Sequence, residues 1–138
     1  MGISNEVGTK TFHENVLHST STLENINIDS KYLHRKSAIL GVKPENITKE
    51  SYSINVTKLS TFIKDNCANE NIDLLKIDTE GHEYSCLLGL FDNEKNVNIK
   101  YLQLESHNDD MYHNTKSFSE ISDLLKENNF ELAEKIKH

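Results

Sequence analysis

The sequence predicts an α/β fold built around a strand-helix-strand unit. Two short apolar runs, at residues 72–77 and 99–104, are rich in isoleucine and leucine, as buried strands are. Between them, Gly81 marks a tight turn, and the following residues have the three-and-four spacing of a helix. Two strands joined in this way form a βαβ unit, which is almost always a right-handed crossover in a parallel sheet.

Earlier elements are predicted from local patterns. Residues 2–14 have turn residues between two extended segments. Apolar and polar residues alternate over residues 52–56, which predicts a strand with one buried face. Ser60 then has the character of an N-cap for a helix that reaches about Cys67.

The segment from residue 15 to residue 50 shows no sustained period. We expect loops there, with a short helix at about residues 32–40 that ends before Pro44. A long irregular segment in a compact domain is usually either a lid or disordered. The length of 138 residues permits a single domain over residues 1–138, with its βαβ core in residues 51–138.

The last third of the chain predicts one further helix and one further strand. Residues 117–128 have an amphipathic apolar stripe, with Ser117 or Ser119 as the N-cap. The two asparagines at positions 128 and 129 end this helix, and residues 130–136 have the pattern of a beginning strand.

Charge and composition limit the class of function. The chain has 15 lysine and arginine residues against 22 aspartate and glutamate residues, a net charge of −7. Such an acidic chain lacks the basic clusters that nucleic acids and anionic membranes require, so we expect neither as a partner and expect a small-molecule substrate. No apolar stretch suits a membrane span or a signal peptide, and the two cysteines form no disulfide pattern. These features predict a cytoplasmic protein.

Acidic and imidazole side chains follow both strands of the βαβ unit. In open α/β sheets, ligands bind in the crevice beyond the carboxyl ends of the strands. If the two strands are neighbours, the loops at residues 78–83 and 105–110 converge at one edge. The candidate site residues in these loops are Asp78, Glu80, His82, Glu83, Glu105 and His107.

Some of these residues also have plain structural interpretations. Glu80 and Glu83 flank a helix start, where acids cap free N–H groups and complement the helix dipole. Asp78 closes an apolar strand, so we expect it partly buried beside the crevice. His82 is either a general base or an exposed histidine at a helix start.

A metal site is a weaker alternative. His107, Asp109, Asp110 and His113 carry ligand-type side chains at close spacing. Their spacing matches no closed metal motif, so a solvated acidic loop is the favoured interpretation and no metal is predicted. The five glycines form neither a dinucleotide-binding fingerprint nor a P-loop.

Several strings resemble one family. IDLLKIDTEGHE, followed by a helical segment, KYLQLESHNDDMY and FELAEKIK, resembles the C-terminal half of FkbM-type methyltransferases. GISNEVGTKTF and YSINVTKLSTFIKDN resemble segments that precede this core in the family. The string K-I-D-x-E-G-x-E after an apolar strand is the most specific of these matches.

The resemblance implies a partial Rossmann-like class I methyltransferase sheet that uses S-adenosylmethionine. The implied partial sheet consists of the central and C-terminal strands. The N-terminal βαβ half, whose glycine loop binds the cofactor in the family, is missing from this chain. The implied reaction is O-methylation of a sugar or other small hydroxylated acceptor, in which a nearby base takes the hydroxyl proton. The 138-residue chain is then expected to be inactive alone. The resemblance assigns acceptor positioning or proton removal to Asp78, His82 and Glu80, and acceptor binding to Glu83, Glu105 and His107.

Two other classes of function remain open at this point. One is a non-catalytic α/β module that pairs with another chain, including a second copy of itself, through exposed sheet edges. The other is a metal-dependent enzyme that uses the loops containing Asp78, Glu80, His107 and Asp109.

Overall fold

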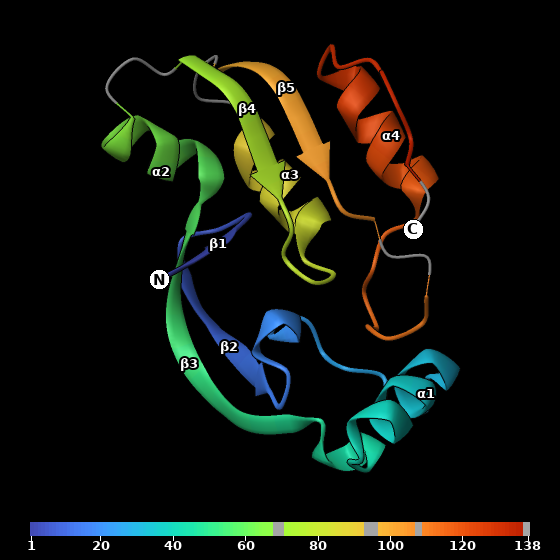
Figure 1. The fold of residues 1–138 in the computed structure, drawn as a ribbon. Helices are drawn as coiled ribbons and strands as arrows, with labels where there is room; N and C mark the ends of the chain where they lie inside the picture. Colours follow the sequence, from blue (N-terminus) through green and yellow to red (C-terminus); the bar gives the residue numbers. More distant parts are fainter. Residues whose placement is uncertain (68–70, 93–96, 107–108, 137–138) are drawn as a thin grey trace.

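Over the residues that the structure describes, the chain forms two small sheets and four α-helices (Figure 1). The computed structural model describes residues 1–67, 71–92, 97–106 and 109–136. In the first sheet β3 lies between β1, to which it is parallel, and β2, to which it is antiparallel. The second sheet pairs β4 with β5 in parallel. The strands are β1 (Gly2–Ser4), β2 (Gly8–Asn15), β3 (Thr48–Lys58), β4 (Asn71–Ile77) and β5 (Asn98–Leu104).

The predicted α/β class and the predicted βαβ unit are both confirmed. α3 connects β4 to β5, and the register places Ile72 beside Ile99 and Ile77 beside Leu104. Among the described residues, β1 pairs with β3 and not with β4, so a continuous Rossmann-like sheet stays a prediction. The helices are α1 (Lys31–Leu40), α2 (Leu59–Asn66), α3 (Glu83–Phe91) and α4 (Phe118–Glu127).

Local sequence explains where two of the helices begin. The Ser30 side chain accepts a hydrogen bond from the Leu33 amide at the start of α1, and Gly41 ends that helix in the left-handed conformation. Ser117 and Glu120 form a reciprocal capping box at the start of α4. The predictions of a helix near residues 32–40 and of a Ser117 cap are therefore confirmed.

The main core lies between the β4–β5 sheet and the helices that cover one of its faces. Figure 1 shows α3 lying across that face. Burying such apolar surface supplies most of the stability of a domain of this size. The buried members of this core are Leu59, Ile63, Ile77, Cys86, Leu87, Leu90 and Ile121.

A second core orders residues 15–50. The sequence alone had left two alternatives for this segment, a lid or disorder. Leu33 from α1 and Ile47 pack against Met111 and Tyr112, and all four are buried. Residues 25–27 also pair with residues 111–113, since the Asn27 amide donates to the Met111 carbonyl at 2.8 Å. This segment is thus held against the loop that follows β5.

Two local predictions are wrong, and a third holds only in part. Ser60 does not cap α2, because β3 runs directly into the helix and Lys58 occupies the N-cap without a side-chain hydrogen bond. Residues 130–136 belong to no helix or strand, so the predicted strand does not form there. The strand predicted over residues 52–56 is part of β3, but its apolar face is only partly buried: Val56 is buried, whereas Tyr52 is 41% exposed even though its ring contacts that of Phe12.

Cys86 is the buried thiol that the sequence suggested, and its reactivity can be predicted. Burial raises the pKa of Cys86 to about 11, so almost none of it is thiolate at pH 8. Cys67 is more exposed. We expect iodoacetamide at pH 8 to modify Cys67 while Cys86 reacts only after unfolding, which peptide mass spectrometry with and without urea measures. Equal labelling of both cysteines in the folded protein would contradict this expectation.

None of the described helices combines the length and the apolar character needed to cross a membrane.

Candidate functional site

The loops after β4 and β5 meet at one edge of the sheet, as the sequence predicts. The Glu105 amide donates a hydrogen bond of 3.2 Å to the Ile77 carbonyl at the ends of the two strands. Further along, the Tyr112 hydroxyl donates to Glu80 Oε2 at 2.8 Å. The parallel register therefore brings the two polar loops together beyond the carboxyl ends of β4 and β5.

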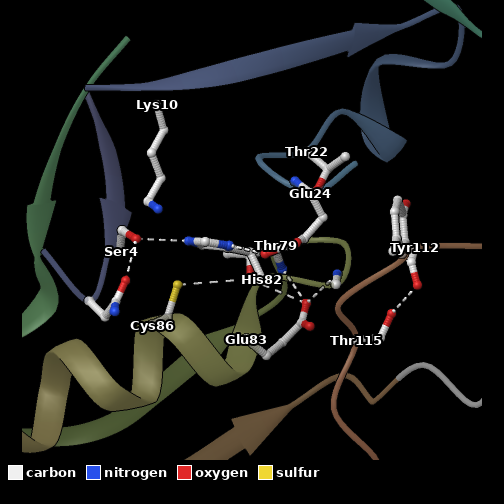
Figure 2. Close-up of polar contacts among 12 residues, drawn as sticks. Ser4, Lys10, Thr22, Glu24, Thr79, His82, Glu83, Cys86, Tyr112 and Thr115 are labelled. Carbon is white, nitrogen blue, oxygen red and sulfur yellow. Dashed lines mark hydrogen bonds and ion pairs between the residues drawn. The ribbon is translucent and has the colours of Figure 1, made fainter. Parts of the chain in front are cut away.

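Glu83 shapes the loop between β4 and α3. Its Oε1 accepts hydrogen bonds from the Thr79 amide (2.9 Å), the Thr79 hydroxyl (3.2 Å) and the Gly81 amide (3.2 Å). Glu83 is 2% exposed. Figure 2 shows its carboxylate turned toward the loop that it holds. Since a buried carboxylate requires such partners, Glu83 holds the loop in shape, and its role in acceptor binding stays a prediction.

Glu80 and Gly81 give the loop its sharp bend. Both have positive φ angles, 52° at Glu80 and 94° at Gly81. A Cβ atom on Gly81 would lie 2.7 Å from Tyr112 Cδ2, so only glycine fits against that ring. The Thr22 hydroxyl donates to the Glu80 carbonyl at 2.7 Å. Glu80 is strained in this conformation because it is not a glycine, and its hydrogen bonds with Thr22 and Tyr112 keep it there.

Tyr112 is a neutral hydrogen-bond donor to Glu80. Its burial, together with its hydrogen bond to the Glu80 carboxylate, raises the pKa of Tyr112 far above its ordinary value. The hydroxyl therefore keeps its proton at any physiological pH. The sequence does not single out Tyr112, because this tyrosine lies in an irregular stretch that has no recognisable local pattern.

His82 is buried and has partners at both ring nitrogens. Nε2 lies 3.0 Å from Ser4 Oγ, and Nδ1 lies 2.6 Å from Glu24 Oε1 (Figure 2). The residue is 3% exposed, so the alternative of an exposed histidine is wrong. Its role as a general base stays a prediction.

No local pattern in the sequence points to Glu24, because 58 positions separate it from its partner His82. Burial is the largest influence on Glu24 and opposes its ionisation, but the hydrogen bond and charge of His82, together with Asn114 and Lys10, outweigh it and lower the pKa of the carboxyl. The order Ser4, His82, Glu24 has the distances of a catalytic triad. Ser4 is 0% exposed, however, so no substrate reaches its hydroxyl, and the three residues act as a link between β1, residue 24 and α3.

Asp78 is exposed as a residue, but its side chain is only 33% exposed, so the expected partial burial holds for the side chain alone. It follows the end of β4, and Lys76 Nζ lies 2.7 Å from its Oδ2. An exposed pair of this kind contributes little to stability.

The residues suggested for a metal site have other contacts. Asp110 accepts a hydrogen bond from the Ser30 hydroxyl, which lowers the pKa of Asp110. Asp109 Oδ1 accepts from the Met111 amide at 2.9 Å. Within the part of the chain that the structure describes, no three metal-ligating side chains gather. His107 lies outside the described residues.

A groove of about 1140 Å³ opens beside the carboxyl ends of the strands. Glu80, Glu105 and Asp109 line it there, and α1 adds Tyr32 and Lys36. His82 lines a separate pocket of about 460 Å³ together with Glu24. The predicted site residues are therefore divided: Glu80 and Glu105 share the groove, and His82 lies at the smaller pocket.

The comparisons with known proteins agree with the motif. The family model described as the methyltransferase FkbM domain matches residues 1–132. No curated protein and no solved structure matches the chain. Because the family model covers almost the whole sequence, the chain belongs to the FkbM methyltransferase family.

Proposed function

We propose that this chain forms the acceptor side of an enzyme that methylates a hydroxyl group of a sugar or another small hydroxylated molecule. The observation that carries the proposal is the position of Glu80. Its carboxylate lines the groove at the carboxyl ends of two parallel strands, where ligands bind in α/β sheets. Membership of a methyltransferase family supplies the reaction class.

Glu80 is the residue to which we assign removal of the hydroxyl proton. Its Oε2 accepts from Tyr112, and its strained backbone is held by Thr22, so the carboxylate has a defined position. Asp78 is exposed and paired with Lys76, and both ring nitrogens of His82 have protein partners. A positioned carboxylate that takes a proton in the transition state typically contributes 10²–10⁴-fold to the rate.

The lining of the groove favours an uncharged acceptor. Five lysines and five carboxylates line it, so neither sign of charge dominates. Tyr32 and Tyr101 add two exposed aromatic rings, which offer apolar faces beside the polar groups. The lining carboxylates are Glu80, Glu105, Asp109, Glu131 and Glu134, and the lysines are Lys36, Lys76, Lys100, Lys126 and Lys135.

The described residues do not fit S-adenosylmethionine, the methyl donor that the family implies. A glycine loop would hold it, because glycines let the backbone approach the ligand closely. Here the Tyr112 ring covers Gly81, the Ser4 carbonyl covers Gly89, and the side chain of Ile54 covers Gly2. A Cβ on Gly8 or Gly41 would meet nothing within 4 Å, so neither glycine lies in a cradle. We therefore place the donor site on another segment of polypeptide.

Calorimetric titration with S-adenosylmethionine tests this arrangement. We expect no measurable heat with the 138-residue chain, and saturable binding with an extended chain in which a strand, a glycine loop and a helix that bind the donor are joined before Met1. A glycine-loop variant of the extended chain is the matched control and is expected to lose binding. Binding by the 138-residue chain alone, or no binding by the extended chain, would contradict the proposal.

Transfer of a labelled methyl group by the extended chain tests the role of Glu80. Sugars and cyclic alcohols are the acceptors to offer, with amines of similar size for comparison. Glu80→Gln is expected to lower kcat by about 10² or more, since the amide cannot take the proton. Glu131→Gln, in the same groove but on the C-terminal segment, is the control and is expected to retain activity. Equal losses in the two variants would argue against Glu80.

A further inference from the structure

Positive charge is concentrated on and around α1, although the chain as a whole is acidic. Residues 30–43 contain four of the 15 lysine and arginine residues and no aspartate or glutamate. This stretch therefore carries +4, and since the net charge is −7 the rest of the chain carries −11. The expectation that no anionic surface is bound rests on the charge of the whole chain, whereas a surface responds to the face that meets it. The four basic residues are Lys31, Arg35, Lys36 and Lys43.

One side of α1 holds the helix to the fold, and another side is exposed. Leu33 and Ser37, which are four positions apart, are buried, and Leu33 belongs to the second core. α1 is part of neither sheet, and Figure 1 shows it at the opposite end of the molecule from α2. Four exposed residues share a side of the helix that is turned away from the second core, and we call them the exposed face of α1. They are Lys31, Tyr32, Arg35 and Ile39.

The two cations of this face have no carboxylate to pair with. Among the residues that the structure describes, the side chains of Lys31 and Arg35 form no ion pair. By contrast, the lysines at positions 10, 49, 76 and 116 each pair with a carboxylate. An anion that meets the exposed face of α1 therefore displaces no partner.

Apolar side chains lie between these cations. Ile39 is 86% exposed, and Tyr32 is 45% exposed. A nucleic acid or a sulfated polysaccharide supplies anions but no apolar layer for an isoleucine. The interface of an anionic bilayer supplies both, because its charged headgroups cover acyl chains. Tyrosine also suits this boundary, where its ring lies at the level of the headgroups.

We propose that the exposed face of α1 docks the chain on the surface of an anionic lipid bilayer. Lys31 and Arg35 meet the charged headgroups, and Ile39 enters the apolar boundary beneath them. Tyr32 also lines the groove at the ends of the strands, so docking holds that groove beside the lipid surface. The inference does not rest on methyl transfer, since it concerns the outside of α1 and not the loop of Glu80.

Co-sedimentation with lipid vesicles tests the proposal on the 138-residue chain. The probe is a vesicle that contains phosphatidylglycerol and phosphatidylcholine, and a vesicle of phosphatidylcholine alone is the comparison. At low ionic strength we expect saturable binding to the anionic vesicle and at least about tenfold weaker binding to the neutral one. Binding is expected to fall in about 1 M sodium chloride, where the screening length is about 3 Å.

Two variants with matched controls locate the contact. Arg35→Glu is expected to weaken binding at least about tenfold, whereas Lys64→Glu makes the same change of charge on an exposed residue of α2 and is expected to change binding less than about twofold. Ile39→Ser is expected to weaken binding at least about fivefold. Val7→Ser is its control, because Val7 is 70% exposed and lies outside α1. All four positions are exposed, so the fold is expected to be unchanged in each variant.

Three results would overturn the proposal. The first is equal binding to anionic and neutral vesicles, and the second is equal losses in Arg35→Glu and Lys64→Glu. The third is unchanged vesicle binding by Ile39→Ser together with equally strong binding of single-stranded DNA, which would assign the face to a soluble polyanion. The outcome with S-adenosylmethionine has no bearing on these measurements, so failure of the proposed reaction and failure of this inference are distinguishable.

Discussion

Replacement of Gly89 by alanine is expected to destabilise the protein by about 3 kcal/mol or more. Gly89 lies in α3, where the helix touches β1, and a Cβ there would clash with the Ser4 carbonyl oxygen and lie 3.0 Å from the Ser4 carbonyl carbon. Pairing with β3 places Ser4 beside Lys58, so β1 has little freedom to move aside. Urea denaturation of the variant and the wild type measures the loss of unfolding free energy.

The control for this prediction is Gly8→Ala. Gly8 lies in β2, has no positive φ, and would place its Cβ where no atom lies within 4 Å. Its effect is expected to stay within about 1 kcal/mol. Similar free energies for the two variants would show that the contact between α3 and β1 is looser than the structure indicates.

Replacement of His82 by alanine is expected to cost about 3–5 kcal/mol, because it leaves the Glu24 carboxylate buried without its partner. The side chains of His82 and Glu24 are 4% and 11% exposed, so water compensates for little of the loss. The change also leaves the Ser4 hydroxyl without its contact to Nε2. Urea denaturation at pH 7 measures the effect.

A double-mutant cycle separates this interaction from the cavity that alanine leaves. Glu24→Gln and the double variant complete the cycle, and a coupling of about 1 kcal/mol or more is expected for two residues in direct contact. Additive losses would show that His82 acts only by filling space.

The same pair predicts a dependence on pH. Burial raises the pKa of Glu24, but the hydrogen bond and charge of His82, together with Asn114 and Lys10, outweigh burial and hold that pKa below the ordinary value of 4.5. The stabilisation from the ionised carboxylate is therefore complete above that ordinary value and is lost as pH falls through the lower pKa of the folded state. Between pH 6 and pH 3, the wild type is expected to lose more stability than Glu24→Gln, and parallel curves would contradict this.

Local patterns were sufficient where the interactions are local. The βαβ unit followed from two apolar runs and the helical spacing between them, since strand and helix patterns depend on neighbouring residues. The start of α4 followed from Ser117 and Glu120, which are three positions apart. By contrast, the strand predicted at residues 130–136 was wrong because a strand needs a partner, and an alternating pattern does not supply one.

In the candidate site, too, some features follow from local sequence and others from contacts between distant segments. The sequence by itself determined the polar loop between β4 and α3, with Glu80 before a glycine, and the meeting of that loop with the one after β5. Only the tertiary structure decided which of its residues face a cavity. It brought Glu24 to His82 and Tyr112 to Glu80, paired Asp78 with Lys76 and buried Glu83. The physical reason is that a side chain's burial and partners come from segments that are distant in the sequence, and no local pattern encodes those contacts.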